Sequence, residues 1–264
     1  MDLKLENKTA FITGSTAGIG YAIAQGLARE GARVILNGRT EETIGAAISK
    51  LKTELPKSEI SGFAADFADA VQVSRLIDKL PEIDILVNNV GIYAAKTFSA
   101  TTDADWQSML EVNLMSGVRL SRALLPGMIE RNWGRILFVS SECASLVPED
   151  LIAYSCTKAA MQALSRGLAQ TTAGSEVTVN SLVPGSTLTE GAEQFLKNQA
   201  SSQGVSKDEV SDQFFKEVRT TSILGRFLDP REVADTAVYL CSPLSSGTNG
   251  AAIRIDGGSV PGIL

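Results

Sequence analysis

Tyr154 and Lys158 are separated by three residues in a chain that contains no histidine. In a helix, residues at i and i+4 lie on one face, about 5–6 Å apart at Cβ. A phenol with a pKa near ~10 exchanges protons poorly at neutral pH, and a neighbouring ammonium group lowers that pKa by favouring the phenolate. The pair therefore predicts an acid–base unit without imidazole. The same spacing is also typical of a solvated helix face, so other residues must decide.

The missing histidine narrows the possible chemistry. It excludes Ser-His-Asp triads, His-Glu-x-x-His zinc sites and histidine general bases. Three cysteines without a Cys-x-x-Cys pair fit buried thiols in a reducing compartment. The amino-terminal residues lack the apolar core of a signal peptide. We therefore expect a cytoplasmic protein whose site holds no metal.

Charge and hydropathy argue against two classes of partner. The net charge is −6, with no run of lysine and arginine of the kind that nucleic-acid binding needs. No segment reaches the ~20 apolar residues of a membrane span. We therefore expect a small-molecule substrate and neither a nucleic-acid nor a membrane partner.

Short apolar runs alternate with helical patterns along the chain. The runs typical of strands are 9–13, 33–37, 60–65, 83–87, 135–139, 177–182 and 252–256. The helical patterns are 18–29, 41–54, about 103–129, one from Tyr154 to about 172, and one that begins with the capping box Asp229-Pro-Arg-Glu232. This alternation predicts one α/β domain over residues 1–264, a Rossmann-like, doubly wound parallel sheet of seven strands with helices on both faces.

A glycine-rich turn joins the first strand to the first helix. Gly14, Gly18 and Gly20 permit a tight turn, close approach of a ligand and close helix–strand packing. The following helix N-terminus presents free N–H groups to a pyrophosphate. The turn therefore predicts a dinucleotide site, with a plain packing turn as the alternative.

The end of the second strand indicates which dinucleotide binds. An acid about 20 residues beyond the glycine turn would bind the ribose of NAD, but the segment here is Leu36-Asn37-Gly38-Arg39. Arg39 could pair with a 2′-phosphate, which favours NADP(H) over NAD(H). The alternative is an ordinary surface arginine.

Two later turns add candidate cofactor contacts. Asp66 follows the third strand, where its carboxylate could accept the adenine amino group, with Phe67 beside it. It could equally cap a turn. Asn88-Asn-Val-Gly91 follows the fourth strand, and Gly91 lets the backbone come close to the cofactor.

Ser141 closes the fifth strand, thirteen residues before Tyr154, and strand ends are where α/β sheets bind ligands. At this point the chain resembles the short-chain dehydrogenase/reductase family over essentially its full length. The segments that carry the resemblance, in the family's order, are Thr13-Gly-Ser-Thr-Ala-Gly-Ile-Gly20, Asn88-Asn-Val-Gly91, Asn113, Ser141, Tyr154-x-x-x-Lys158, Pro184-Gly185 and Ile255-Asp-Gly-Gly258.

The resemblance implies four catalytic residues. Tyr154 would protonate a carbonyl oxygen in reduction and act as the base in reverse, and Ser141 would orient that oxygen. Lys158 would hold the nicotinamide ribose and lower the pKa of the tyrosine. Asn113, a poor helix former inside a long helical pattern, would anchor a water that links Lys158 to solvent; a local helix distortion is the alternative.

The resemblance also implies the cofactor contacts and the division of chemistry. The cofactor would supply the hydride, and the protein would supply position and electrostatics. Pro184, Gly185 and Thr187 would bind the nicotinamide amide. The full set of expected contacts is Gly14, Ser15, Thr16, Gly18, Ile19, Gly20, Arg39, Asp66, Phe67, Asn89, Gly91, Tyr154, Lys158, Pro184, Gly185 and Thr187.

Residues 186–224 interrupt the β/α rhythm and match the family's substrate lid, with helical patterns around 190–200 and 207–219. Their phenylalanines, with Ile223 and Leu224, suggest an apolar pocket wall, although they could equally pack the lid helices. We expect an NADP(H)-dependent interconversion of a neutral or moderately lipophilic carbonyl and its alcohol.

Three other functions stay open. A 3-oxoacyl-acyl carrier protein reductase would need a basic docking surface, and the turn at 131–135 is not clearly basic. A sugar or polyol dehydrogenase shares the same residues. A non-catalytic NADP-binding regulator would not need the intact acid–base set. Because family members usually form tetramers through the helices near 103–129 and 152–172 and the last strand, we expect a homotetramer or at least a homodimer.

Overall fold

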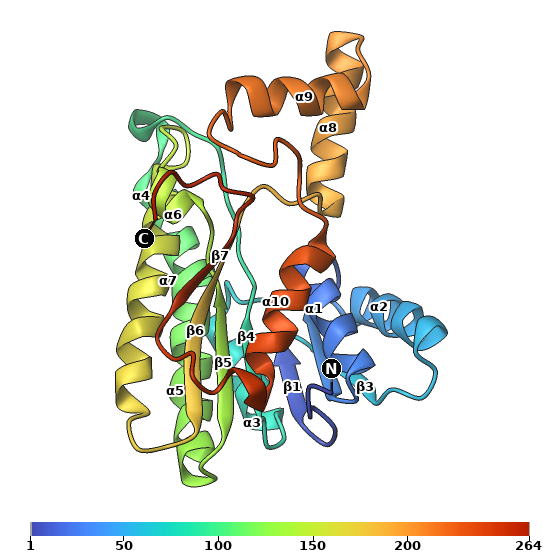
Figure 1. The fold of residues 1–264 in the computed structure, drawn as a ribbon, viewed down its shortest axis with the longest axis vertical. Coiled ribbons are helices and arrows are strands. Elements are labelled where there is room, and N and C mark those ends of the chain that lie inside the picture. Colours follow the sequence, from blue (N-terminus) through green and yellow to red (C-terminus); the bar gives the residue numbers. More distant parts are fainter. Residues whose placement is uncertain (1, 264) are drawn as a thin grey trace.

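The computed structural model describes residues 2–263. Its seven strands are β1 (Thr9–Ile12), β2 (Arg33–Gly38), β3 (Ile60–Ala64), β4 (Ile85–Asn88), β5 (Gly134–Val139), β6 (Val177–Pro184) and β7 (Ala252–Ile255). They form one sheet in the order β3-β2-β1-β4-β5-β6-β7, and every neighbouring pair is parallel (Figure 1). The predicted seven-stranded, doubly wound parallel sheet is confirmed.

Helices cover both faces of the sheet. Those on one face are α1 (Gly18–Arg29), α2 (Glu41–Glu54) and α10 (Pro230–Cys241). Those on the other face are α3 (Ala70–Lys79), α5 (Ser116–Glu130) and α7 (Ile152–Thr171). Neighbouring strand residues such as Phe11 and Ile12 are both fully buried but pack into different clusters, because successive side chains of a strand point to opposite faces. Because both faces of the sheet are covered by helices, consecutive residues of each strand are buried, which explains why the strands are continuous apolar runs in the sequence.

Side-chain caps fix where several helices begin. The capping box of Asp229 and Glu232 starts α10 as predicted. Helix α3 lies outside the helices predicted from the sequence; its signal is weak because only Val73 and Leu76 are buried, and Asp69 caps its first N–H groups. Within residues 2–263, no helix combines the length and the apolar character that crossing a membrane requires.

The long helical pattern expected at 103–129 is divided in the structure. Helix α4 (Asp103–Met109) leads into a π-helical segment, η2 (Leu110–Met115), and α5 continues the same direction. Asn113 lies in the middle of this wider turn, where its side chain bonds the main chain of Ile92 instead of facing along the helix. Single π-helical turns are frequent at functional sites, and this one aims an amide inward.

The segment 186–224, which we call the lid, contains α8 (Glu190–Gln203) and α9 (Lys207–Glu217). Figure 1 shows both helices standing beyond the carboxyl end of the sheet. They enclose a small apolar cluster of their own, made of Leu196, Ala200 and Val210 with Phe227. The remaining short helices are η1 (Phe98–Ala100), α6 (Cys143–Leu146) and η3 (Pro243–Ser245).

Candidate active site

Four side chains named from the sequence meet at the carboxyl end of the sheet, and we call Asn113, Ser141, Tyr154 and Lys158 the catalytic cluster. Ser141 lies two residues beyond the end of β5, and Tyr154 and Lys158 lie in the first two turns of α7. Lys158 is buried, and its Nζ donates to the carbonyl oxygen of Val139 at 2.8 Å. The same ammonium lies 5.5 Å from the centroid of the Tyr154 ring. The end of β5 therefore fixes the helix that carries the acid–base pair.

The amide of Asn113 is bonded on both sides. Its Oδ1 accepts from the N–H of Ile92 at 2.7 Å, and its Nδ2 donates to the Ile92 carbonyl at 2.9 Å and to Thr157 Oγ1 at 3.0 Å. The helix distortion considered as an alternative for this residue is therefore present, and it joins the loop after β4 to α7. A proton-relay role stays a prediction.

Burial shifts the pKa values of both members of the acid–base pair. Desolvation raises the pKa of Tyr154 above its ordinary value, against the smaller lowering effect of the Ser141 side chain. Desolvation also lowers the pKa of Lys158 to about 8. Burial is the largest cause of the shift on Tyr154, and the lowering of the tyrosine pKa by Lys158 that the resemblance implies stays a prediction. The phenol keeps its proton at neutral pH, which is the form that can donate to a carbonyl oxygen.

The glycine turn has the shape of a cradle for a dinucleotide. Gly14 and Gly18 both have φ of +58°, a conformation that side chains disfavour. A Cβ on Gly20 would lie 2.6 Å from the carbonyl oxygen of Gly14. Asn89 Nδ2 donates to the carbonyl oxygens of Thr13 and Gly14 at 2.9 and 3.0 Å, which ties the turn after β4 to the turn after β1. These contacts fit the phosphate-binding role expected of the turn.

Asn37, which stands where an NAD-binding acid would be, holds this turn from the side. Its Oδ1 accepts from Gly14 N–H at 3.0 Å, and its Nδ2 donates to the Phe63 carbonyl at 3.1 Å. Its own N–H donates to Ser15 Oγ at 3.0 Å, and that hydroxyl donates to the Ile12 carbonyl at 2.8 Å. Ser15, expected to contact the cofactor, therefore has its side chain committed to the protein.

Arg39 lies just after β2 at the mouth of the glycine turn. It is exposed and makes no ion pair or side-chain hydrogen bond with any residue in the described range 2–263. Thr16 packs against Gly38, where a Cβ would come within 2.7 Å of its methyl group, so this rim of the turn is closely packed. Arg39 is thus available to the 2′-phosphate of NADP(H). The alternative, that it is an ordinary surface arginine, also stays open.

The two residues after β3 differ in what they can offer a cofactor. Asp66 Oδ1 accepts from the Ala68 N–H at 3.0 Å, so the turn-capping alternative is present, and its contact with adenine stays a prediction. Phe67 is fully buried in the cluster beneath α3 and α5. Core packing occupies the ring, so the contact of Phe67 with the cofactor stays a prediction for its main chain.

The segment after β6 is packed tightly against its neighbours. A Cβ on Gly185 would lie 2.8 Å from Asp256 backbone atoms and 2.9 Å from Glu142 Oε2, so glycine is required there. Thr187 Oγ1 donates to the Gly185 carbonyl at 2.9 Å. Pro184 is the last residue of β6 and pairs with β7. This fixed edge lies beside Ser141, where the nicotinamide end is expected.

Three side chains that the sequence did not single out also meet the site. Glu190, at the start of α8, accepts the Gly18 N–H through Oε2 at 2.8 Å. The ring of Tyr93 meets that of Tyr154 edge-on, with centroids 5.9 Å apart. Glu142 is buried next to Ser141. The contacts of Glu190 and Tyr93 join segments far apart in the chain, so residue spacing gives no signal for them.

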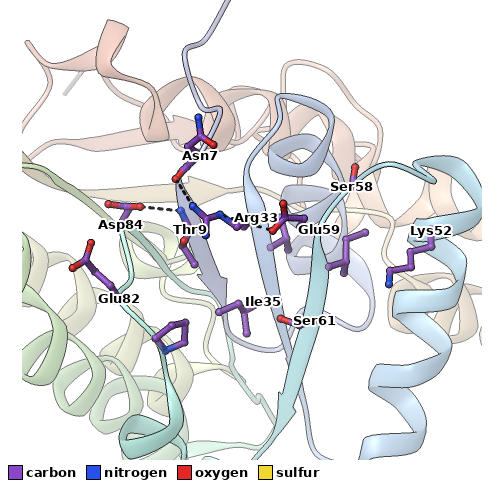
Figure 2. A pocket seen from close by; sticks show the side chains of 13 residues that line it. Asn7, Thr9, Arg33, Ile35, Lys52, Ser58, Glu59, Ser61, Glu82 and Asp84 are labelled. Atoms are coloured by element: carbon purple, nitrogen blue, oxygen red, sulfur yellow. Dashed lines mark hydrogen bonds and ion pairs between the residues drawn. The ribbon is translucent and has the colours of Figure 1, made fainter.

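A cavity of about 620 Å³ lies at the other end of the sheet. It is lined by residues at the amino ends of the strands, among them Thr9, Arg33 and Asp84 (Figure 2). Asp84 Oδ2 accepts the Thr9 N–H at 2.9 Å, and Arg33 Nη2 donates to the Asn7 carbonyl at 3.3 Å. These polar groups satisfy one another, and none belongs to the catalytic cluster.

The comparison with known families decides the identity of the chain. The family model described as short chain dehydrogenase matches residues 8–200. This chain belongs to the short-chain dehydrogenase family. That family's oxidoreductases include an uncharacterized oxidoreductase, YvaG, of Bacillus subtilis, which is 44% identical over 264 residues and covers 100% of both chains.

Two relatives with named activities differ from each other in substrate. The 3-oxoacyl-[acyl-carrier-protein] reductase FabG of Aquifex aeolicus is 31% identical, over 98% of this chain and 99% of its own. The L-sorbose reductase of Gluconobacter frateurii, solved with NADPH and L-sorbose, superposes with a TM-score of 0.93 at 32% identity and full coverage of both chains. The fold of this family member is therefore shared with reductases of different carbonyl compounds.

Proposed function

We propose that this protein is an NADP(H)-dependent carbonyl reductase, which also oxidises the corresponding alcohol, with Tyr154 as the general acid and base. The observation that supports this most is the catalytic cluster beside the glycine turn, in which Asn113, Ser141 and Lys158 are buried and Tyr154 is half-buried. It brings a protonated phenol, an ammonium group and a serine hydroxyl to the sheet edge where α/β proteins bind ligands. A regulator that only binds NADP would not need this set.

Each residue of the cluster has a separate task in the proposed reaction. The bound cofactor supplies the hydride. Ser141 holds the carbonyl oxygen of the substrate toward Tyr154, and the phenol donates its proton to that oxygen as charge develops there. Lys158 then stabilises the phenolate that remains, from its place 5.5 Å from the ring centroid. Asn113 keeps the loop after β4 in register with α7.

The proposed preference for NADP(H) rests on two residues. Arg39 is available to a 2′-phosphate, and Asn37 stands where an NAD-binding protein would have an acidic residue. The L-sorbose reductase similar to this chain was solved with NADPH. We expect Arg39→Ala to raise the KM for NADPH by about 10–100-fold, because charged hydrogen bonds contribute about 1.5–3 kcal/mol, and to leave the KM for NADH nearly unchanged.

A matched control for this test is Arg33→Ala, which removes an exposed arginine from the other end of β2. It should leave both cofactor constants unchanged. A wild-type enzyme that prefers NADH in kcat/KM would contradict the cofactor assignment.

The substrate is proposed as a neutral ketone or aldehyde. The lid phenylalanines support this only in part, because Phe214 and Phe215 pack against each other and against Phe227 just past the lid, with each pair of centroids 5.1 Å apart. Phe195 and Ile223 stay exposed. The similarity to L-sorbose reductase favours a sugar or polyol as a second candidate, and the FabG similarity favours a 3-oxoacyl thioester.

A carbonyl panel tests these classes against one another. Reduction is followed as loss of NADPH absorbance with simple ketones, ketoses and 3-oxoacyl thioesters, and the class with the highest kcat/KM names the substrate. No turnover of any carbonyl would refute the proposed activity.

We further propose a cytoplasmic homotetramer or homodimer. The three cysteines are free thiols, as a reducing compartment requires. The outer side of α7 carries the exposed small residues Ala159, Ala163 and Gly167, which permit close approach of a second helix. Light scattering that finds a monomer at micromolar concentration would refute the oligomer.

A further inference from the structure

One buried ion pair joins the lid to Glu142, the residue that follows Ser141 of the catalytic cluster. Arg219 Nε donates to Glu142 Oε1 at 2.8 Å, and the two side chains are 11% and 3% exposed. In the other ion pairs between residues 2–263, every side chain is at least 22% exposed. Exposed pairs stabilise a fold little, whereas a buried charge that loses its partner is strongly unfavourable.

Glu142 connects the turn of the catalytic serine to the segment expected to hold the nicotinamide. It follows Ser141 directly, and its N–H donates to the Pro184 carbonyl at 2.9 Å. Its Oε1 also accepts from Ser186 Oγ at 3.2 Å, while its Oε2 is buried without a hydrogen-bond partner among the described residues. Without a cation beside it, the neighbour of the catalytic serine would hold an uncompensated negative charge.

Arg219 connects that carboxylate to the lid. It lies two residues beyond α9, and its N–H donates to the Phe214 carbonyl at 2.9 Å. Its guanidinium carbon is 5.7 Å from the Phe214 ring centroid, and that ring stacks on Phe227. Its Nη2 also lies 3.7 Å from Cys143 Sγ, one residue past Glu142. The aromatic group of the lid is thereby attached to the serine turn through one side chain.

The other attachments of the lid lie at its two ends. Near its start, Glu190 accepts the Gly18 N–H, and near its end the N–H groups of Ile223 and Leu224 donate to the Gly257 carbonyl at 2.9 and 3.0 Å. Its apolar cluster is separate from the two clusters that cover the sheet. The body of the lid therefore depends on Arg219 for its place over the site.

We propose that Glu142 and Arg219 form a latch that couples the closed position of the lid to the position of Ser141. The inference rests on the proposed carbonyl reductase function, and both are positioning residues, because neither replaces the acid or the hydride. When the lid is closed, the guanidinium neutralises Glu142 and the serine turn is held. When the lid opens, water must solvate the carboxylate, which loosens that turn until substrate binding closes the lid again.

Three substitutions and two measurements test the latch. Arg219→Ala and Glu142→Gln should raise the KM for the carbonyl substrate and lower kcat/KM by about 100-fold, as displacement of a reacting group by about 1 Å does. Arg219→Lys keeps a cation within reach of Glu142 and should recover part of that loss. Hydrogen exchange of Arg219→Ala should be faster in α8 and α9 and unchanged in β1 to β6.

The matched control is Arg226→Ala, which removes the partner of Glu232 in an exposed ion pair just past the lid. It should leave kcat/KM and lid exchange unchanged. The latch is refuted if Arg219→Ala stays within about twofold of wild-type kcat/KM. It is also refuted if the sheet exchanges faster together with the lid, which indicates general loss of stability. If the wild type reduces no carbonyl, the proposed function fails, and the exchange experiment still tests the latch.

Discussion

The catalytic cluster and the lid are built in contrasting ways. Lys158 and Asn113 are 3% and 1% exposed; Lys158 Nζ donates to the Val139 carbonyl, and both polar atoms of the Asn113 amide have protein partners. The lid encloses only a small cluster around Leu196 and meets the body through a few polar contacts. Sites held by a rigid core keep reacting groups in place, whereas weakly attached segments can move to admit a ligand. We therefore assign the proposed reaction to the catalytic cluster at the sheet edge, and control of substrate access to the lid.

The sharpest test of this division is Tyr154→Phe. We expect kcat for carbonyl reduction to fall by about 10³-fold, since proton donation by a positioned side chain contributes about 10²–10⁴-fold. The Kd for NADPH and the melting temperature should stay near those of the wild type. Tyr239→Phe, on the exposed side of α10, makes the same chemical change outside the site and should have no effect. Unchanged turnover by Tyr154→Phe would remove the catalytic cluster from the mechanism.

Substitutions of two phenylalanines test whether the core and the lid unfold independently. Phe11→Ala in β1 should lower the free energy of unfolding of the whole domain by about 3–5 kcal/mol, because its ring is fully buried. Phe227→Ala should leave denaturant unfolding of the sheet nearly unchanged and speed hydrogen exchange in α8 and α9. Equal losses of global stability in the two variants would show that lid and core unfold as one unit.

The buried Lys158 predicts that kcat for reduction depends on pH through the catalytic cluster and not through the lid. Burial lowers the pKa of Lys158 to about 8, so the side chain is charged below that pH and neutral above it. A neutral lysine cannot stabilise the phenolate left on Tyr154, so kcat for reduction should fall by about tenfold per pH unit above 8. Circular dichroism at each pH checks that the protein stays folded. A flat profile to pH 10 would contradict this role for Lys158.

The smallest expected effect lies where the lid begins. Glu190 places a carboxylate on the Gly18 N–H, at the positive end of α1 where a pyrophosphate is expected. Glu190→Gln keeps the acceptor but removes the like charge, so the Kd for NADPH should fall by about 2–5-fold. Glu193→Gln is the control, because Glu193 pairs with Lys197 and Lys207 instead. Weaker NADPH binding in Glu190→Gln would show that the lid carboxylate supports the cofactor site.

The sequence predicted the sheet and most helices because neighbouring residues are enough to determine where these elements form. The apolar runs at β1 to β7 and the box at Asp229 define elements through neighbouring residues alone. The sequence indicated a helix distortion at Asn113 only as an alternative. Its π-helical form and the partner of its amide could not be predicted in this way, because Ile92 lies 21 residues away. The buried side chain of Phe67 and the raised pKa of Tyr154 depend on which segments pack around them.

The sequence by itself determined the order of β and α segments, the glycine turn and the residue types of the acid–base set. Each of these follows from side-chain chemistry within a few positions. Only the tertiary structure decided that Glu142 meets Arg219 and that Glu190 meets Gly18, contacts that span 77 and 172 residues. The balance of burial and charge on Tyr154 and Lys158 was also decided there, since desolvation depends on every segment that surrounds a group and not on its neighbours in the chain.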